Sequence, residues 1–289
     1  MTRGVGHQVP AQATLRVTVA RRRGGVVNHE EDLVAVEEPL EIRVVVESAG
    51  RRQRHSVAVT MRTPGEDFEL AAGYLVSEGV VTQPGDIWRI EHCVQSSAST
   101  DENVVEVHLA PAGGFDAEQL SRKVVTSSAC GICGRTSIEA VQKSCAGRPR
   151  GDFQLSPSTL LGLTDLLSAK QPAFSHTGGL HAAALFNSAG QLCDLREDVG
   201  RHNALDKLVG GRLLNDQVPI SRSLALVSGR VSFELVQKSL LAGIPMLAAV
   251  GAPSSLAIEL ATEYGVTLIG FLGSDRFNVY CGEERIADE

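Results

Sequence analysis

The sequence of 289 residues is poor in aromatic side chains, which make up 4% of it, and it contains no run of about 18 apolar residues, the length that spans a bilayer. Few aromatic rings argue against a surface that stacks nucleic-acid bases. A formal net charge of -7 argues against a general nucleic-acid binder, because phosphate neutralisation needs a basic surface. The N-terminus shows no apolar stretch of a secretory signal. We therefore expect a cytoplasmic protein that uses neither nucleic acid nor a membrane as its partner.

Several common catalytic motifs are also absent. The sequence has no Gly-x-x-x-x-Gly-Lys-Ser/Thr loop for nucleotide hydrolysis and no Gly-x-Ser-x-Gly nucleophile elbow. The His-x-Glu and Pro-Cys-x-x-Cys pair of zinc nucleobase deaminases is missing too. The six cysteines are sparse, so we expect reduced thiols and no disulfide framework. No metal held by protein ligands is expected. The cysteines are Cys93, Cys130, Cys133, Cys145, Cys193 and Cys281.

The most informative motif that is present is Cys130-Gly131-Ile132-Cys133-Gly134. Two thiols stand two residues apart on a glycine-rich turn, ahead of a helix-like segment over 135–143. The N-terminus of a helix favours the thiolate, which is the form that attacks sulfur or binds metal. The small residues around the pair leave it little to pack against, so we expect a mobile, reactive loop over 125–136.

The remaining pattern indicates an α/β protein. Residues 1–25 are expected to form a flexible arm, and residues 26–124 an N-terminal α+β module. Residues 137–289 are expected to form a three-layer αβα sandwich, because strands alternate with helices of about ten residues. The module is predicted to have strands at 42–46, 55–61, 87–93 and 104–109 and a helix from Thr63 to Gly79. The sandwich is predicted to have strands at 181–187, 191–196, 224–227, 246–250 and 266–271, with helices at 156–170, 200–209, 232–242 and 254–264.

In such sheets ligands lie outside the carboxyl ends of the strands. Those ends carry Ser228-Gly229-Arg230, the turn over 251–255 and the segment over 270–277. Each turn alone is equally consistent with a plain connection, since glycine and serine are common there. Taken together, and with Arg230 and Arg276 beside them, they favour a phosphate-bearing ligand.

Two further clusters are candidates for the same site. In His176-Thr177-Gly178-Gly179-Leu180-His181, two histidines flank a glycine turn, which is either a strand-edge turn or, less favoured, a metal site. The segment 197–207 places polar residues near one helix end, where Asp198 is a candidate cap. A solvated helix face is the alternative for Lys207. These polar residues are Arg201, His202, Asn203 and Lys207.

Taken as a combination, these motifs resemble the formate dehydrogenase accessory sulfurtransferases, the FdhD proteins. The resemblance rests on the Cys130 pentapeptide, the segments over 176–181 and 197–207, Ser228-Gly229-Arg230, Ala242-Gly243-Ile244-Pro245 and Thr267-Leu268-Ile269-Gly270-Phe271, and it covers roughly 30–282. It implies a second half similar to the cytidine deaminase core without its zinc, and a cytosolic homodimer.

The resemblance also implies a function. Members of this family take persulfide sulfur from a cysteine desulfurase and pass it to the molybdenum or tungsten bis-guanine-dinucleotide cofactor that a formate dehydrogenase catalytic subunit needs. Cys130 matches the persulfide-forming cysteine, with Cys133 as its partner. The family often has an arginine where this chain has Gly273, so we expect Arg276 to make that phosphate contact. The segment that matches the family's nucleotide-contacting residues is Phe271, Leu272, Gly273, Ser274, Asp275 and Arg276. The other expected cofactor ligands are His176, Gly178, Gly179, Arg201, His202, Asn203, Lys207, Ser228, Gly229 and Arg230.

Two alternatives stay open. A thiol–disulfide oxidoreductase would share the Cys-x-x-Cys chemistry, although the motif has no tryptophan before it and does not follow a first βαβ strand. A non-catalytic cofactor chaperone would use the pair structurally or hold zinc with it. Persulfide loading, reductase turnover and metal content distinguish these functions.

Overall fold

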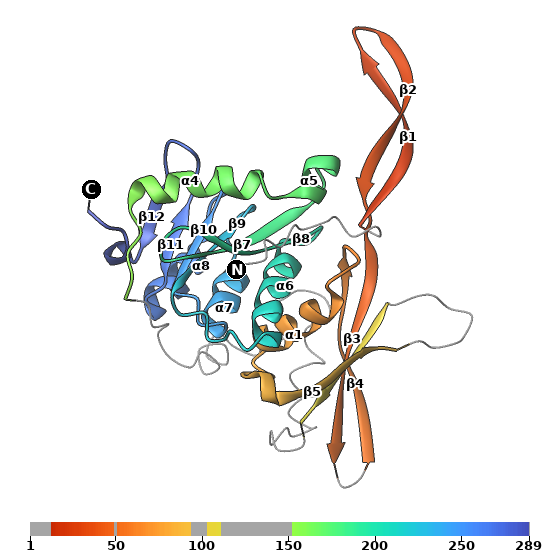
Figure 1. Cartoon of the computed structure of the whole chain (residues 1–289), viewed down its shortest axis with the longest axis vertical. Coiled ribbons are helices and arrows are strands. Elements are labelled where there is room, and N and C mark those ends of the chain that lie inside the picture. Colours follow the sequence, from red (N-terminus) through yellow and green to blue (C-terminus); the bar gives the residue numbers. More distant parts are fainter. Residues whose placement is uncertain (1–12, 49–50, 94–102, 111–151, 289) are drawn as a thin grey trace, which may run out of the picture.

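The computed structural model describes residues 13–48, 51–93, 103–110 and 152–288, which form a mixed α/β fold (Figure 1). The larger sheet has six strands in the order β12-β11-β10-β9-β7-β8. β9, β10 and β11 are parallel, whereas β7 and β12 run antiparallel to their neighbours. The strands are β7 (His181–Asn187), β8 (Leu192–Asp198), β9 (Ser223–Val227), β10 (Met246–Ala249), β11 (Thr267–Gly270) and β12 (Asn278–Cys281).

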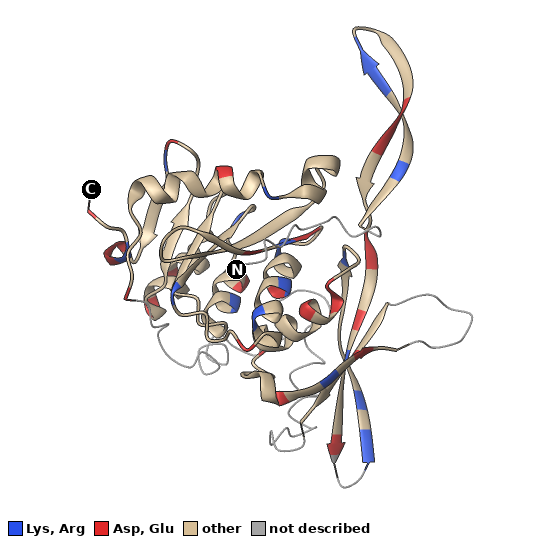
Figure 2. Cartoon of the chain, in the orientation of Figure 1, with Lys and Arg blue, Asp and Glu red and all other residues tan. Residues whose placement is uncertain are grey.

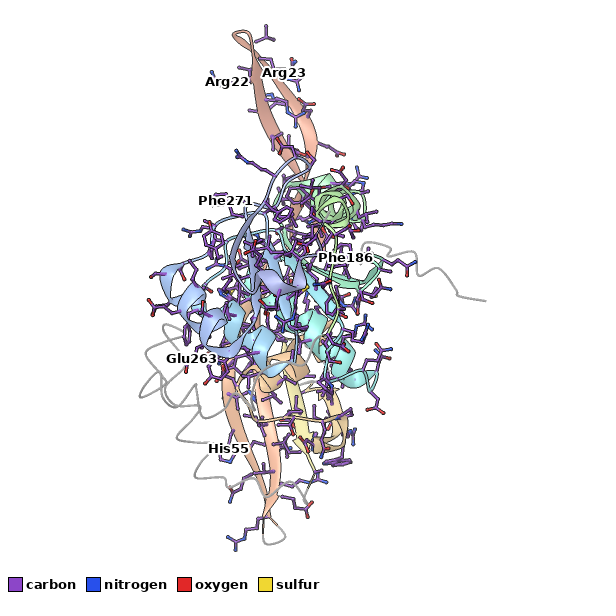
Figure 3. The ribbon with its side chains drawn as sticks, turned by 90° about the vertical axis from the view of Figure 1, so that its left-hand side faces the viewer. Arg22, Arg23, His55, Phe186, Glu263 and Phe271 are labelled. Carbon is purple, nitrogen blue, oxygen red and sulfur yellow. The ribbon has the colours of Figure 1, made fainter. Side chains whose placement is uncertain are left out.

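Helices cover both faces of this sheet, as the predicted αβα sandwich requires. On β7, Ala182, Ala184 and Phe186 point to the face that α4 covers, whereas Ala183 and Leu185 point to the opposite face. Because both faces are buried, the strand is apolar throughout and does not alternate with polar residues. Figure 3 shows Phe186 inside the molecule. The helices are α4 (Pro157–Ser168) with α5 (Pro172–Thr177) after it on one side, and α6 (Arg201–Leu214), α7 (Phe233–Leu241) and α8 (Ser255–Tyr264) on the other.

A second sheet of four strands lies beyond α6, in the order β4-β3-β6-β5. Its inner face, with Ile42, Val44, Val105 and Val107 fully buried, packs on α1. The elements are β3 (Glu38–Ser48), β4 (Arg51–Arg62), α1 (Asp67–Ser77), the 3-10 turn Pro84–Asp86, β5 (Ile87–His92) and β6 (Val104–Leu109).

One hydrophobic core joins the two sheets. A single cluster of buried side chains runs from Leu40 on β3 through α1 and α6 to Leu268 on β11. The predicted boundaries at 124 and 137 both fall outside the described residues, so that division of the chain stays a prediction. Within the described residues, the module and the sandwich share their packing.

The contact between α1 and α6 is made by backbone against backbone. A Cβ atom added at Gly73 would lie 1.8 Å from the carbonyl oxygen of Asp206, and one at Gly210 would lie 1.8 Å from that of Glu69. Only hydrogen fits at these two positions, so the two glycines set the distance between the helices.

A long two-stranded hairpin differs from the expected flexible arm. β1 (Thr14–Arg23) pairs with β2 (Val26–Ala35) over ten antiparallel positions and projects from the body. Ion pairs cross it, with Arg21 bonded to Glu30 and Asp32. Basic residues gather at its end, where Figure 3 places Arg22 and Arg23 (Figure 2). The residues are solvated as expected, but part of the predicted arm is ordered strand.

The other expected elements are present, with shifted ends. β6 and β7 have the predicted bounds, whereas α6 continues to Leu214, beyond the predicted end at 209. Besides the hairpin strands, four short elements of the described residues were not predicted: α5, β12 and the 3-10 turns at Pro84–Asp86 and Glu283–Arg285. Thr63 does not cap α1, because its hydroxyl accepts the amide of Val199. No helix among the described residues is long and apolar enough to cross a bilayer.

The helix contact predicts a sharp sensitivity to one methyl group. Gly210→Ala forces the new Cβ into the Glu69 carbonyl and should lower the free energy of unfolding by about 3 kcal/mol or more, as overpacking of a rigid contact does. Gly162→Ala in α4 is the matched control, because nothing lies within 4 Å of its added Cβ. It should raise stability by about 0.5–1 kcal/mol through helix propensity. Denaturant unfolding followed by circular dichroism measures both; equal effects would contradict the contact.

Candidate functional site

Three loops meet at the carboxyl ends of the parallel strands. The amide of Gly251, after β10, bonds the carbonyl of Gly229, after β9, at 3.1 Å. The amide of Phe271, after β11, bonds the carbonyl of Gly251 at 3.1 Å. Parallel neighbours bring these ends together, and the backbone bonds then tie the loops into one edge. The structure therefore places Ser228, Gly229 and Arg230 beside the segment over 271–276.

Some amides of these turns are used within the protein. Ser228 donates to Ala182, Val231 to Ala252, and Ser254 to Val231. Side chains add positive charge at this edge, where both Arg230 and Arg276 are exposed.

Arg201 lies against the same edge from the start of α6. A Cβ added at Gly229 would meet the Arg201 Cδ atom at 3.4 Å and the His181 ring at 3.4 Å. The Arg201 Nε atom is buried and makes no hydrogen bond within the described residues. His181 Nδ1 lies 3.3 Å from the Ser228 hydroxyl, which accepts the amide of Ala182. His181 thus joins the site, although its sequence motif had not placed it among the ligands.

Both histidines near Arg201 are held neutral. Burial, assisted by the charge of Arg201, lowers the pKa of His181. Burial also lowers the pKa of His202 to about 4, although the Glu234 carboxylate opposes that shift. At neutral pH the positive charge of this region therefore belongs to arginine, and the imidazoles offer hydrogen bonds only.

The segment over 271–276 presents side chains unequally. Phe271 is 42% exposed and adopts a left-handed backbone with φ 52°, which is rare for a residue with a side chain (Figure 3). Leu272 is buried at 1% exposure, so it can offer a ligand only its backbone. The Gly273 amide bonds the Arg276 carbonyl at 2.9 Å, and Ser274 and Asp275 are exposed. This hydrogen bond closes the turn over 273–276, in which Arg276 is exposed.

Lys207 and Asn203 are structural in this arrangement. The Lys207 ammonium, 1% exposed, lies 2.9 Å from the Asp198 carboxylate and 2.9 Å from the Thr63 carbonyl. The Asn203 amide donates to Asp198 and to the Met61 carbonyl. Asp198 does not cap α6, but its carboxylate also accepts the amides of Thr63 and Gly200. Lys207 therefore has no free surface for a phosphate, and these residues join β4, β8 and α6.

His202 faces a cleft rather than the strand ends. The cleft has a volume of about 370 Å³ and lies between β4 and the starts of α6 and α7. At its inner end Lys238 pairs with Asp206 at 2.7 Å, and both are 3% exposed. Burial opposes the ionised form of Lys238, but the Asp206 and Glu234 carboxylates outweigh it and raise its pKa. The Lys238 ammonium stays charged and internal.

The turn after α5 faces the hairpin. His176, exposed, shares a cleft of about 270 Å³ with Arg16 and Glu31 of the hairpin. Gly178 ends α5 in a left-handed conformation, and a Cβ at Gly179 would touch Ala35 at 3.6 Å. These three expected ligands therefore lie beside the hairpin.

A second polar cluster, on the outer face of the four-stranded sheet, was not expected from the sequence. Ligand atoms of Glu91, Glu106 and His108 lie within 4.8 Å of one another. His108 bonds Glu91 at 2.9 Å, and Arg54 bonds Glu106 at 2.9 Å. Arginine supplies the positive charge that a metal ion would bring, so the cluster is satisfied by its own side chains.

Cys130, Cys133 and the expected mobile loop over 125–136 lie outside the described residues, as does the helix-like segment over 135–143. Of the cysteines within the described ranges, Cys93, Cys193 and Cys281 are free thiols.

Comparison with known proteins agrees with the motifs. The model of the FdhD/NarQ family matches residues 35–287. The chain is 50% identical over 281 residues to the "Sulfur carrier protein FdhD" of Streptomyces coelicolor, covering 96% of each chain. It is 46% identical over 267 residues to that of Mycobacterium tuberculosis, covering 90% of this chain and 94% of the relative.

A solved structure supports the fold. The crystal structure of a putative formate dehydrogenase accessory protein from Desulfotalea psychrophila superposes with a TM-score of 0.72 at 24% identity, covering 95% of this chain and all of that one. With the sequence matches spanning nearly the full length, the conclusion follows that this chain is a member of the FdhD/NarQ family.

Proposed function

We propose that this protein is a sulfur carrier that serves a formate dehydrogenase. Cys130 accepts persulfide sulfur from a cysteine desulfurase, and the protein delivers it to a molybdenum or tungsten bis-guanine-dinucleotide cofactor bound at the strand-end edge. The observation that carries this proposal is the near full-length match to relatives named as sulfur carriers, together with Cys130 and Cys133 in this sequence. A cytoplasmic homodimer is part of the proposal.

The loading step is an exchange without net oxidation. The Cys130 thiolate attacks the outer sulfur of the desulfurase persulfide, the desulfurase thiolate leaves, and Cys130 becomes the persulfide. For delivery, the Cys133 thiolate attacks the inner sulfur of Cys130 and releases the outer sulfur as hydrosulfide. The hydrosulfide leaves with the electron pair of the broken S–S bond, the Cys130–Cys133 disulfide is the oxidised product, and a cellular thiol then reduces it.

Binding of the cofactor is supported by the charge at the strand-end edge. Arg201, Arg230 and Arg276 lie on three elements that meet there, in a chain whose net charge is -7. A guanidinium offers paired donors that match phosphate oxygens. Phe271, exposed on the same loop, offers an aromatic face to a guanine base.

The two alternatives predict other results. A disulfide oxidoreductase would turn over disulfide substrates faster than it takes up persulfide. A non-catalytic chaperone with a structural cysteine pair would hold zinc and take up no sulfur. Metal analysis of the purified protein and reductase assays separate both from the carrier.

Sulfur loading should depend on one of the two cysteines. Cys130→Ala should abolish the mass increase of one sulfur atom after incubation with a desulfurase and cysteine. Cys133→Ala should keep that increase but release hydrosulfide more slowly on addition of thiol, because it lacks the attacking group. Intact-mass spectrometry and sulfide detection measure the two steps. Full loading of Cys130→Ala would overturn the assignment.

Nucleotide binding should depend on the arginines at the carboxyl ends of the strands and not on arginines elsewhere on the surface. GDP serves as a fragment of the cofactor, and Arg276→Ala should weaken it by about 1.5–3 kcal/mol through loss of a charge-assisted bond. Arg222→Ala is the matched control, because Arg222 is 59% exposed and precedes the amino end of β9. Its effect should stay within about 0.5 kcal/mol. Calorimetry that gives equal losses for both variants would remove Arg276 from the site.

A further inference from the structure

The free edge of the four-stranded sheet is unusually unprotected at β4. Ser56 to Met61 is the longest run without a charged residue or a proline among the edge strands that the structure describes. Proteins usually guard such edges with charges, prolines or very short strands. Here Val59 is 69% exposed and Met61 is 47% exposed, so the edge is apolar as well as open.

The ladder shows which backbone groups are available. Glu41 on β3 lies opposite Val59, and its amide bonds the carbonyl of Asn103, which is on the side away from β4. Glu41 and Val59 are therefore a non-hydrogen-bonded pair of the antiparallel ladder. In such a pair the backbone groups of both residues point outward, so the amide and carbonyl of Val59 point away from β3. The carbonyls on either side are already used, Val57 by the Tyr74 hydroxyl at 3.2 Å and Met61 by the Asn203 amide at 2.8 Å. The free stretch is short and centred on Val59.

The cleft of about 370 Å³ opens directly beside this stretch. Apolar side chains of Ile42, Ala58, Leu70 and Tyr74 line part of it, beside the Lys238–Asp206 pair. A groove between a strand edge and helices is the arrangement that binds an extended peptide as an added strand, with main-chain bonds for affinity and a pocket for one side chain.

The charges of the cleft select the occupant. Lys238 pairs with Asp206 at 2.7 Å and lies 3.5 Å from Glu234, and His202 is neutral. One ammonium thus faces two carboxylates, and the cleft keeps one net negative charge, which lies at the half-buried Glu234. We propose that this groove binds a short extended peptide segment of a partner protein, with an aliphatic side chain in the pocket and a neighbouring lysine or arginine at Glu234. The site is separate from the strand-end edge, and the proposal does not depend on sulfur transfer.

The experiment uses the full chain and a phage-displayed library of short linear peptides. Selected peptides should share an aliphatic residue next to a basic one, and a synthetic peptide of that consensus is then measured by fluorescence anisotropy. Val59→Lys should weaken it at least about tenfold, because a lysine at the centre of an edge strand disfavours strand pairing and repels the basic residue of the peptide. Val26→Lys is the matched control, since Val26 is 60% exposed on the hairpin, and it should change affinity less than about twofold.

A second readout tests strand addition itself. The amide of Val59 should exchange hydrogen more slowly when the peptide is bound, whereas the unfolding midpoint of Val59→Lys should match that of wild type. Equal affinity for Val59→Lys and wild type, no protection at Val59, or failure to select any peptide overturns the proposal. Sedimentation of the wild type and both variants is the last measurement. If the wild type is a dimer and Val59→Lys alone is a monomer, β4 pairs with a second copy of the chain, and the proposal of a partner peptide is overturned.

Discussion

The close contact of α1 and α6 is the constraint on which the rest of the structure depends. Because Gly73 and Gly210 let the two backbones touch, one hydrophobic cluster extends from the four-stranded sheet to the six-stranded sheet. The same contact fixes the start of α6 relative to β4, and thereby sets both the cleft beside Val59 and the direction of Arg201. The two larger sheets consequently share one core, and the two candidate surfaces keep a fixed separation.

Buried ion pairs secure the same junction. Asp198 with Lys207 joins β8 and α6 to the loop after β4, and Asp206 with Lys238 joins α6 to α7. Removing one partner of such a pair leaves a buried charge uncompensated, at a typical cost of about 3–5 kcal/mol. These lysines therefore hold the helices in place, and the buried Arg62, paired with Asp67 at 2.9 Å, does the same between β4 and α1.

Much of the fold could be predicted from the sequence, and the site only in part. The continuous apolar run from Ala182 to Phe186 predicted a strand that is buried on both faces. The alternation along β4 predicted a strand that is buried on one face. The hairpin was not predicted, although Leu15, Val17 and Val19 alternate with Arg16 and Thr18, because its strands bury little and lie in a polar, basic segment. Lys207 was predicted to bind the cofactor, but its ammonium pairs with the Asp198 carboxylate and bonds the Thr63 carbonyl. Sequence spacing does not reveal these contacts, because Thr63 is distant in the chain. The sequence named His181 only as one of a histidine pair, and its place beside Ser228 follows from the antiparallel pairing of β7 with β9.

The hairpin has a consequence for how the molecule moves in solution. Ten paired residues at about 3.3 Å each make β1 and β2 a ribbon that extends roughly 30 Å. Such a projection adds friction with very little mass, so the 30.7 kDa chain should diffuse like a larger compact sphere. A monomer will then elute earlier from a sizing column than a compact sphere of the same mass. Its subunit number is therefore read from mass, by sedimentation equilibrium or light scattering, rather than from hydrodynamic radius.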